Sequence, residues 1–286
     1  MIRGLLAGLF LLLVLPADAA GIRVIDDSGR TLEFSRPPQR IVSLTPHLTE
    51  LLYAVGAGGQ LVGVDSASDY PAAARALPRV GDTSRIRLER ILALKPDLIV
   101  AWVGGNRAAD VYGVAQLGIP VLNTEATRLE DVARLLRLLG EASGHAEAGA
   151  RQAQAYDERL EALKRRYARV ERIPVFYQIW DRPLMTVGGV HWIDEALAVC
   201  GARNIFHDLK AVAPVVSREA VLRRQPRLIL GGSDAPDPRA TWMAFGGLPA
   251  VRDDAFIRVD ADRLHRATPR LLEGVAGLCA ALADYR

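Results

Sequence analysis

The feature that most constrains the fold of this chain is the stretch 150–172, which contains neither glycine nor proline. Its apolar residues recur at intervals of 3, 4, 3, 4 and 3 positions, and charged residues fill most positions between them; these apolar residues are Ala153, Tyr156, Leu160, Leu163, Tyr167 and Val170. The spacing predicts an amphipathic helix with one apolar face. At 1.5 Å per residue it would be about 35 Å long, enough to pass from one domain to the next.

The segments on the two sides of this helix resemble each other. Residues 88–100 match residues 218–230 at an offset of 130, and each reads as a helix, a proline and a buried strand. Residues 52–57 match residues 197–202 at a different offset, 145, so the repeat contains insertions and is not a solenoid. A chain of 286 residues also exceeds what one small core usually covers. We expect two similar lobes joined by one long helix, although helix–proline–strand is common punctuation in α/β chains and does not by itself require a repeat.

Short buried runs alternate with helical stretches in both halves. A hairpin is expected over 23–34, where two alternating runs flank an Asp-Ser-Gly turn. Thr45 and Pro46 open a helix that ends at Val55. The fold class is therefore α/β, with two similar lobes of parallel-type sheets covered by helices. The expected buried strands are 40–44, 61–64, 98–102, 120–122, 175–179, 184–187 and 228–230.

The first 19 residues read as a secretory signal peptide. Arg3 supplies a positive charge, Leu5 to Leu15 form an apolar run too short to span a bilayer comfortably, and Ala17-Asp-Ala19 offers a cleavage pattern. A membrane anchor or a buried helix is the alternative. The first cysteine is Cys200, so no lipid-attachment site follows the run, and we expect a soluble exported protein. The expected division is signal peptide 1–19, N-terminal lobe 20–143, backbone helix 144–172 and C-terminal lobe 173–286.

The composition excludes several classes of protein. Lys+Arg outnumber Asp+Glu by 36 to 33, and the basic residues are scattered, so we expect no nucleic-acid partner. Two cysteines are too few for a disulfide-dense miniprotein or a four-thiolate zinc site. In an oxidising compartment they either form one disulfide or remain two buried thiols. The nucleophile-elbow, phosphate-loop and zinc-protease motifs are all missing from the sequence, so an enzyme is disfavoured.

The candidate site lies where the strands end, because open α/β sheets bind ligands at the carboxyl ends of their strands. Tyr70, Trp102 and Trp180 offer flat apolar contact to a large ligand, while ordinary core packing is the alternative for each. Trp192 falls on a helical pattern and is expected in the core. The run 262–266 is the polar part of the predicted site, with a solvated loop as the alternative: Asp262, Arg263, Leu264, His265 and Arg266.

Three of the five histidines fall in predicted strand-end loops: His47, His191 and His265. Imidazole ligates metals readily. No pair of histidines has the spacing of a metal motif, so we expect no bound metal ion. A single histidine ligating the metal of a haem or corrinoid remains open.

Four runs together resemble one known family: 38–46 (PQRIVSLTP), 49–57 (TELLYAVGA), 93–100 (ALKPDLIV) and 117–121 (LGIPV). They are similar to periplasmic substrate-binding proteins with a helical backbone, which serve ABC importers for cobalamin, iron siderophores and haem. The resemblance covers essentially the whole chain after residue 19. Seven stretches are similar to the cobalamin branch of this family: 62–71, 88–97, 101–106, 199–201, 204–206, 216–219 and 266–270.

This resemblance implies further roles for named residues. Glu89 and Glu219 match two carboxylates, one on each lobe, that dock the family's binding proteins on the permease; stabilisation of the helix start is the alternative for both. Cys200 and Cys279 match a disulfide of the cobalamin branch. The chain departs from that branch where enterobacterial members carry cleft aromatics, which leaves a different corrinoid or another metal chelate open as the ligand. The departing residues are Ala67, Thr83, Ala213 and Arg263.

The function that we expect is that of a monomeric, non-catalytic periplasmic receptor. It would capture cobalamin or a related corrinoid, use no cofactor of its own, and deliver the ligand to the permease dimer of an ABC importer in the inner membrane. The alternative within the family is a receptor for a ferric siderophore or haem. The alternative outside it is a periplasmic enzyme that uses the histidines of the cleft.

Overall fold

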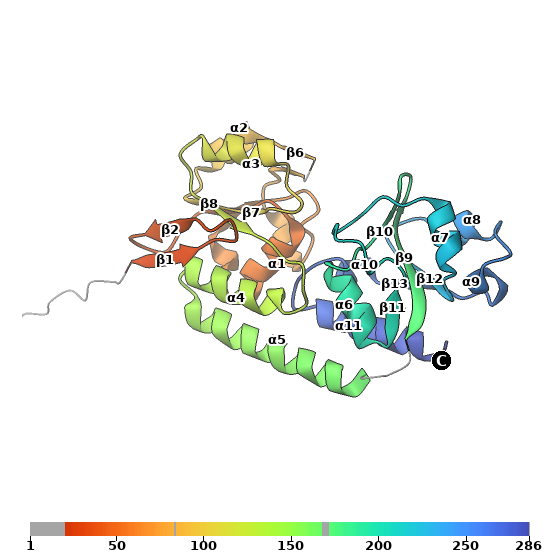
Figure 1. Ribbon diagram of the computed structural model, residues 1–286. Helices are drawn as coiled ribbons and strands as arrows, with labels where there is room; N and C mark the ends of the chain where they lie inside the picture. The colour runs from red at the N-terminus through yellow and green to blue at the C-terminus, as the bar shows by residue number, and fades with distance from the viewer. Residues whose placement is uncertain (1–20, 83, 168–171, 286) are drawn as a thin grey trace, which may run out of the picture.

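The computed structural model describes residues 21–82, 84–167 and 172–285. The predicted signal peptide lies outside these residues, as do Thr83 and Val170. Within them, no helix is long and apolar enough to cross a membrane. Two α/β lobes lie side by side above one long helix (Figure 1).

The N-terminal lobe is built on a four-stranded sheet in the order β4-β3-β7-β8, in which every pairing is parallel. Helices α1 and α4 pack on one face of this sheet, and α2 and α3 pack on the other. Burial of both faces explains why the strands are continuous apolar runs rather than alternating ones. The elements are β3 (Ile41–Ser43), α1 (Pro46–Ala54), β4 (Leu61–Val64), α2 (Leu88–Leu94), β7 (Leu98–Trp102), α3 (Ala108–Ala115), β8 (Val121–Thr124) and α4 (Asp131–Ala142), with the short strands β5 (Gly81–Asp82) and β6 (Arg85–Ile86) and the 3-10 turns η1 (Ala57–Gln60) and η2 (Ala72–Ala76) between them.

The predicted hairpin at the N-terminus is present as the antiparallel strands β1 (Ile22–Ile25) and β2 (Thr31–Phe34). Its turn closes the outer edge of β8: the Arg30 guanidinium donates to the Val121 carbonyl at 3.0 Å, and Asp26 Oδ2 accepts from the Asn123 backbone N–H at 3.2 Å. Burial alone would raise the pKa of Asp26, but hydrogen bonds from Ser28, Arg30 and Asn123 lower it to about 2. The buried carboxylate therefore protects a sheet edge that would otherwise expose unpaired backbone groups.

The C-terminal lobe repeats this plan with a five-stranded sheet. The order is β10-β9-β12-β13, and β11 pairs with the first part of β9; only the β9–β10 pairing is antiparallel. Helices α6 and α11 cover one face, and α7, α8 and α9 cover the other. The elements are β9 (Ile173–Asp181), β10 (Leu184–Thr186), α6 (Trp192–Val199), β11 (Ala202–Asn204), α7 (Arg218–Arg224), β12 (Leu228–Gly232), α8 (Arg239–Trp242), α9 (Pro249–Arg252), β13 (Phe256–Val259), α10 (Ala261–Leu264) and α11 (Leu271–Ala283).

The backbone confirms the internal repeat at both predicted offsets. Lys95 after α2 and Gln225 after α7 both have φ of 46°, a left-handed conformation that is uncommon for residues other than glycine. Gly56 after α1 and Gly201 after α6 likewise have φ of 92° and 73°. Because the same unusual turn follows the equivalent helix in each lobe, and leads directly into β7 and β12 after Lys95 and Gln225, the similarity is more than common punctuation.

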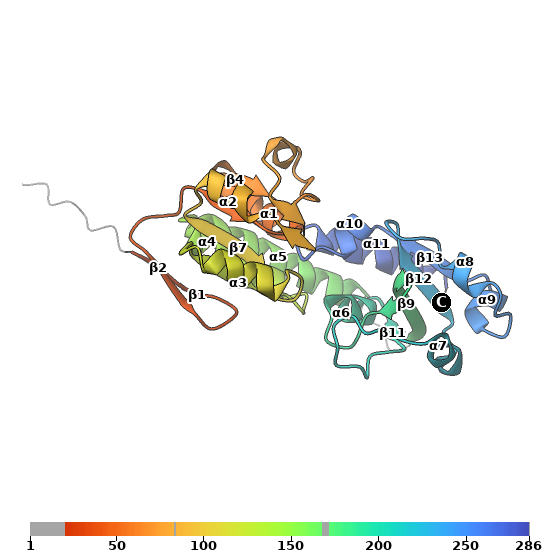
Figure 2. The same ribbon diagram turned by 90° about the horizontal axis from the view of Figure 1, so that it is seen from above.

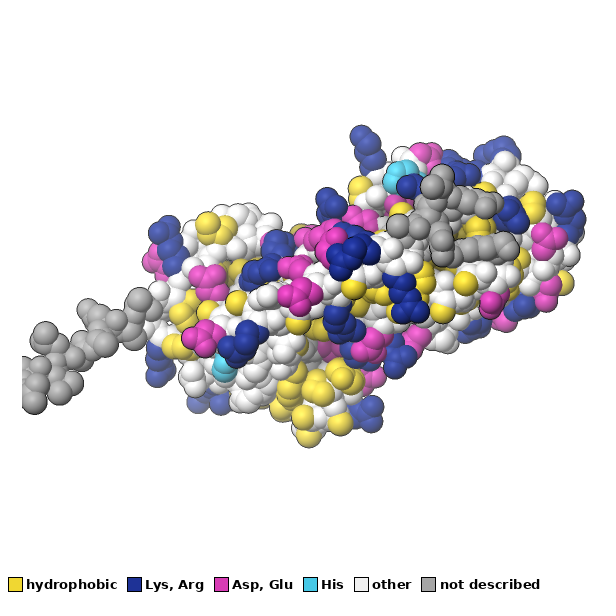
Figure 3. Space-filling view, turned by 90° about the horizontal axis from the view of Figure 1, so that it is seen from below, with side chains coloured by type: hydrophobic (Ala, Val, Ile, Leu, Met, Phe, Trp, Pro, Cys, Tyr) yellow, Lys and Arg dark blue, Asp and Glu magenta, His cyan; other side chains and the backbone are white. Residues whose placement is uncertain are grey.

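The helix between the lobes is α5 (Ala146–Tyr167), which begins inside the expected backbone helix 144–172 and four residues before the glycine-free stretch. Its buried positions include Ala153, Tyr156 and Leu160, as the apolar spacing predicts. It packs closely on α4, where a Cβ on Gly140 would lie 2.8 Å from the Cα of Gly149, and it also contacts α6 and α11 of the second lobe (Figure 2). Its outer side belongs to a surface on which basic and acidic side chains are interspersed (Figure 3).

The two cysteines form a disulfide, Cys200–Cys279. Cys200 follows α6 and Cys279 lies within α11, so the bond joins the first and last helices of the C-terminal lobe, as the resemblance implies. Both side chains are buried. The disulfide therefore ties the end of the chain to the lobe core beneath the sheet.

Candidate functional site

The carboxyl ends of the two sheets face each other across the lobe boundary. The loop after β4 carries Asp69 and Tyr70, and the segment after α10 carries Arg266 and Arg270. Arg266 Nη1 lies 2.7 Å from Asp69 Oδ1, so these strand-end segments are in direct contact. This is the location expected for a ligand site in open α/β lobes.

Trp102 stands at the end of β7 and forms part of the N-terminal wall. Its indole N–H donates to Glu125 Oε1 at 2.9 Å, and its ring lies edge-on to the ring of His47 with centroids 5.2 Å apart. A Cβ on Gly105 would come within 2.0 Å of the indole, so the following turn can fold against the ring only because that residue is glycine. The indole is thus held at both its polar and its apolar parts, which suits a fixed contact surface.

His47 lies behind Trp102 on α1 and is buried. Burial, together with the positive charge of Arg266, lowers its pKa to about 3. The imidazole is therefore neutral at neutral pH, and it presents an uncharged ring to the indole. A neutral imidazole at this position adds no charge to the wall.

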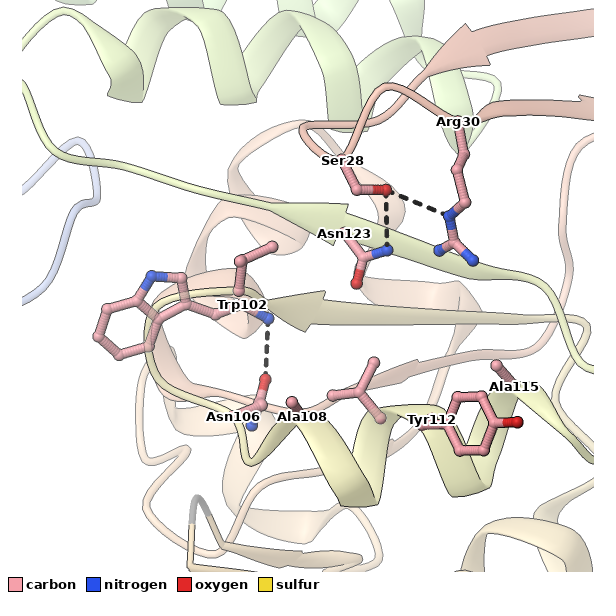
Figure 4. Close-up of a pocket in the computed structure, with 10 residues that line it drawn as sticks. Ser28, Arg30, Trp102, Asn106, Ala108, Tyr112, Ala115 and Asn123 are labelled. Atoms are coloured by element: carbon pink, nitrogen blue, oxygen red, sulfur yellow. Dashed lines mark hydrogen bonds between the residues drawn. The ribbon is translucent and has the colours of Figure 1, made fainter.

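A cavity of about 290 Å³ opens on the outer side of Trp102 (Figure 4). It lies between α3, the edge strand β8 and the turn of the β1–β2 hairpin, with Trp102 at one end and Tyr112 toward the other. Val103 and Tyr112 line it and are largely exposed. Trp102 therefore separates the lobe boundary from a surface cavity of the N-terminal lobe.

The base of the boundary carries a group of charges from both lobes. Glu50 of α1 accepts hydrogen bonds from Arg266 at 2.9 Å and from Arg270 at 2.6 and 2.9 Å. The guanidinium of Arg270 also lies 3.9 Å from the centre of the Tyr70 ring. A cavity of about 310 Å³ adjoins these residues and is lined from both lobes. We call Glu50, Asp69, Asp262, Arg266 and Arg270 the interlobe ion cluster.

The C-terminal wall contains a chain of three polar side chains. The hydroxyl of Tyr177 lies 2.7 Å from His265 Nε2, and His265 Nδ1 lies 3.5 Å from an oxygen of Asp234. Burial raises the pKa of Tyr177, and the contact with His265 holds the pKa of Asp234 below its usual range. These contacts fix the orientation of the His265 ring, which is largely buried.

A second contact joins the lobes near α6. Arg128 of the N-terminal lobe lies 3.0 Å from Glu195, and Glu195 Oε2 accepts from the Leu129 backbone N–H at 2.8 Å. Burial raises the pKa of Glu195 despite these contacts. His191 lines the adjoining cavity of about 350 Å³. Burial, together with the nearby His265, lowers the pKa of His191 to about 3, so His191 is neutral at neutral pH.

The structure brings together part of the predicted ligand set. Tyr70, Asp262 and Arg266 meet around the interlobe ion cluster, since Asp262 lies 2.9 Å from Arg266 Nη2 and Arg270 joins Tyr70 to the same group. His265 follows on the C-terminal side, and Trp102 adjoins through His47. Trp180 is half exposed near the end of β9, where its indole donates to the Arg182 carbonyl at 3.0 Å.

Two residues of the run 262–266 point elsewhere. Leu264 is fully buried in the core, where its carbonyl accepts from the Trp192 indole at 2.9 Å. Arg263 turns toward α11 and pairs with Asp260 and Glu273 at 2.9 and 3.3 Å. The expectation that Trp192 belongs to the core is confirmed. A ligand contact by Arg263 or Leu264 therefore stays a prediction, and the orientation of these two side chains does not favour it.

The two predicted docking carboxylates occupy equivalent places. Glu89 lies in the first turn of α2 and Glu219 in the first turn of α7, and both are exposed. The two helices lie on the side of the lobes away from α5 (Figure 1). Hydrogen bonds from its own backbone N–H and from Ser217 lower the pKa of Glu219, so it is ionised at neutral pH.

Two residues of the site are not among the predicted binding residues. Glu50 and Arg270 complete the interlobe ion cluster. The one available signal for Glu50 is an acidic residue inside the apolar run of α1. Among the described residues, no three His, Cys, Asp or Glu side chains form a group able to hold a metal ion.

Comparison with known proteins places this geometry in context. The model of the family described as "Periplasmic binding protein" matches residues 41–262. The vitamin B12-binding protein of Vibrio parahaemolyticus serotype O3:K6 is 36% identical over 246 residues, covering 86% of this chain and 90% of that protein. The crystal structure of the periplasmic vitamin B12 binding protein BtuF of Vibrio cholerae superposes with a TM-score of 0.78 at 38% identity, covering 87% of this chain and 98% of that one. The periplasmic heme-binding protein RhuT from Roseiflexus sp. RS-1 gives a TM-score of 0.75 at 26% identity, covering 86% and 98%.

Proposed function

The chain belongs to the periplasmic binding protein family, and we propose that it captures cobalamin or a related corrinoid and delivers it to the permease of an ABC importer. The observation that carries this proposal is similarity to vitamin B12-binding proteins over nearly the whole chain, in both sequence and structure. A non-catalytic, monomeric receptor exported to the periplasm fits this role. The proposed parts are the signal peptide 1–19, the lobes 20–143 and 173–286, and the backbone helix 144–172.

The strand-end residues support a large, partly flat ligand. Trp102 offers a fixed aromatic surface, Tyr70 is half exposed beside Arg270, and Trp180 is half exposed on the other lobe. Asp262, His265 and Arg266 supply polar groups between these rings. Such a set matches a macrocycle that carries amide side chains, because aromatic contact provides area and the charged groups orient the amides.

Haem is the second candidate ligand. The similarity to a heme-binding protein, and a histidine whose ring is held by Tyr177 and Asp234, favour it. Isothermal titration of the mature protein with cyanocobalamin, cobinamide, haemin and a ferric hydroxamate separates the candidates. We expect the corrinoids to bind most tightly. Tighter binding of haemin or of the hydroxamate, with no heat from either corrinoid, would replace the proposed ligand.

The first prediction concerns Trp102. Replacing Trp102 by alanine removes an aromatic contact worth about 1.5 kcal/mol, so corrinoid affinity should fall roughly tenfold. Trp242→Phe is the matched control, because that indole is buried in the core of the C-terminal lobe, between α8 and the sheet. It should lower the melting temperature and leave the dissociation constant unchanged. Equal dissociation constants for Trp102→Ala and the wild type would remove Trp102 from the site.

A second prediction concerns lobe movement. The lobes are joined by α5, by the interlobe ion cluster and by the Arg128–Glu195 contact. Few backbone dihedrals are free to change, so closure on ligand should be small compared with receptors hinged on extended strands. Small-angle scattering should give the same radius of gyration, within error, with and without cyanocobalamin. A clear decrease on binding would contradict this.

A further inference from the structure

Glu50 carries a charge that is almost completely removed from solvent. Its side chain is 2% exposed, and it lies on α1 of the N-terminal lobe. Both of its oxygens are occupied: Oε1 accepts from Arg266 and Arg270 at 2.9 and 2.6 Å, and Oε2 accepts from Arg270 at 2.9 Å. All three hydrogen bonds come from the other lobe. A buried carboxylate is tolerated only when such partners remain in place.

The two arginines are bound to the N-terminal lobe by further contacts. Arg266 also holds Asp69 at 2.7 Å, and Arg270 covers the Tyr70 ring at 3.9 Å. Burial alone would lower the pKa of Arg266, but the hydrogen bonds that it donates to Asp69 and Glu50 raise the pKa above its ordinary value. Both guanidiniums are mostly shielded from water. Their attraction to Glu50 is consequently screened less than that of a surface pair.

The Arg128–Glu195 contact between the lobes is weaker, because both of its side chains are more exposed to solvent. In the Arg128–Glu195 pair the side chains are 65% and 29% exposed, and exposed pairs contribute little. Arg128 is also shared with Glu130 at 3.6 Å. The interlobe ion cluster therefore provides the more rigid of the two connections. The interlobe ion cluster is also the connection that adjoins Tyr70.

We propose that Glu50 is a positioning residue that sets the angle between the two lobes, and that it controls ligand retention by holding Arg266 and Arg270 against the N-terminal wall. The statement about the angle stands independently, whereas the statement about retention rests on the proposed function. Glutamine at position 50 would keep the shape but remove the charge and replace one acceptor oxygen by a donor. Arg270 would then lose its bidentate carboxylate partner, and the lobes would sample wider angles.

The test measures the distance between the lobes directly. Ala93→Cys on α2 and Arg223→Cys on α7 are exposed positions at the repeat offset of 130, and the native cysteines are already paired, so spin labels attach to these two sites. Pulsed electron–electron double resonance measures the distance between the two labels. Without ligand, the labelled protein that carries no other substitution should give one narrow distance distribution. Glu50→Gln should broaden and shift it. An unchanged distribution would overturn the proposed control of the angle.

Ligand retention is measured separately, by stopped-flow displacement of bound cyanocobalamin. Glu50→Gln should speed dissociation at least tenfold, with a smaller change in the association rate. The matched control is Asp26→Asn, which also neutralises a buried, ion-paired carboxylate, but one whose partners Ser28, Arg30 and Asn123 all belong to the N-terminal lobe. This control should lower the melting temperature without changing distance or dissociation. A wild-type rate for Glu50→Gln, or an equal acceleration in Asp26→Asn, would overturn the retention role.

A second variant, Arg270→Lys, tests the same contact from its other side, in case Glu50→Gln fails to fold. Arg270→Lys keeps the positive charge but cannot make both hydrogen bonds to Glu50 at once. It should broaden the distance distribution in the same sense, and combining it with Glu50→Gln should add little, because both changes break the same contact. Fully additive broadening would show that the two residues do not act together. Failure of the wild type to bind any corrinoid would refute the proposed function and leave the distance measurement valid.

Discussion

Replacing both Glu89 and Glu219 by alanine should weaken docking on the permease strongly while leaving ligand binding intact. The two carboxylates occupy the same place in each lobe, exposed in the first turn of α2 and α7, and among the residues that the structure describes neither shows a buried partner that would fix a purely structural role. Charge pairs across an interface set orientation and encounter rate, and truncating one partner of each pair weakens binding strongly. We expect the double variant to bind reconstituted permease roughly 100-fold more weakly, and each single variant to show an intermediate effect.

The controls separate docking from stabilisation of the helix start. Glu89→Gln and Glu219→Gln keep a hydrogen-bond acceptor, so a role limited to the helix start predicts a mild effect, whereas docking requires the charge. Arginine at either position should be worse than alanine, because it places like charges face to face. Glu147→Ala with Glu158→Ala removes the same net charge from exposed positions of α5 and should leave transport unchanged.

Salt gives an independent check on the same docking prediction. Binding of the wild type to the permease should weaken as ionic strength rises, because exposed charges are screened, and binding of the double variant should depend on salt much less. The double variant should keep the melting temperature and the corrinoid affinity of the wild type. Wild-type transport by the double variant would show that the two glutamates act at the helix starts alone.

Removing the disulfide should cause the largest loss of stability. The Cys200–Cys279 bond closes a loop with a sequence separation of 79, and the chain-entropy model assigns such a loop about 4 kcal/mol. Cys200→Ala with Cys279→Ala should therefore lower the melting temperature by roughly 10 °C, measured by circular dichroism on the mature protein. Alanine is the suitable replacement because both sulfurs are buried.

A reductant supplies the control for the disulfide prediction. Reduction of the wild type under conditions that open the bond should bring its melting temperature close to that of the double variant, and the same reductant should not affect the variant. Corrinoid affinity at 20 °C should be nearly unchanged, because the disulfide lies between α6 and α11 rather than at the strand ends. A double variant as stable as the wild type would show that lobe packing alone sets the stability.

Most helices and strands of the fold could be predicted from local sequence patterns. The strands β4 and β7 lie at their predicted bounds, because each is a buried apolar run bounded by residues that stop it. The repeat was visible because each lobe must solve the same packing problem with a helix, a left-handed turn and a buried strand. The start of α5 at Ala146 lies close to the predicted 144, although Gly149 falls inside the helix, where it allows close contact with Gly140.

The site was only partly accessible, for a geometric reason. Arg263 and Leu264 are consecutive residues of α10, so the helix turns their side chains about 100° apart, and Arg266 lies beyond the end of that helix. Their side chains therefore point to α11, to the core and to the other lobe. A linear motif identifies the segment that approaches the ligand and cannot say which of its side chains reach it.

By itself, the sequence determined the two α/β lobes, their order along the chain, the helix that joins them and the strand ends at which a ligand would bind, because these depend on the period of apolar residues and on turn chemistry. The tertiary structure alone decided how the lobes meet. Glu50 and Arg270 are 220 positions apart, and Tyr177 and His265 are 88 apart. The sequence around one residue of such a pair does not indicate which distant residue is its partner. The pairing of a buried charge is a property of the assembled lobes, since only folding removes the water that would otherwise solvate it.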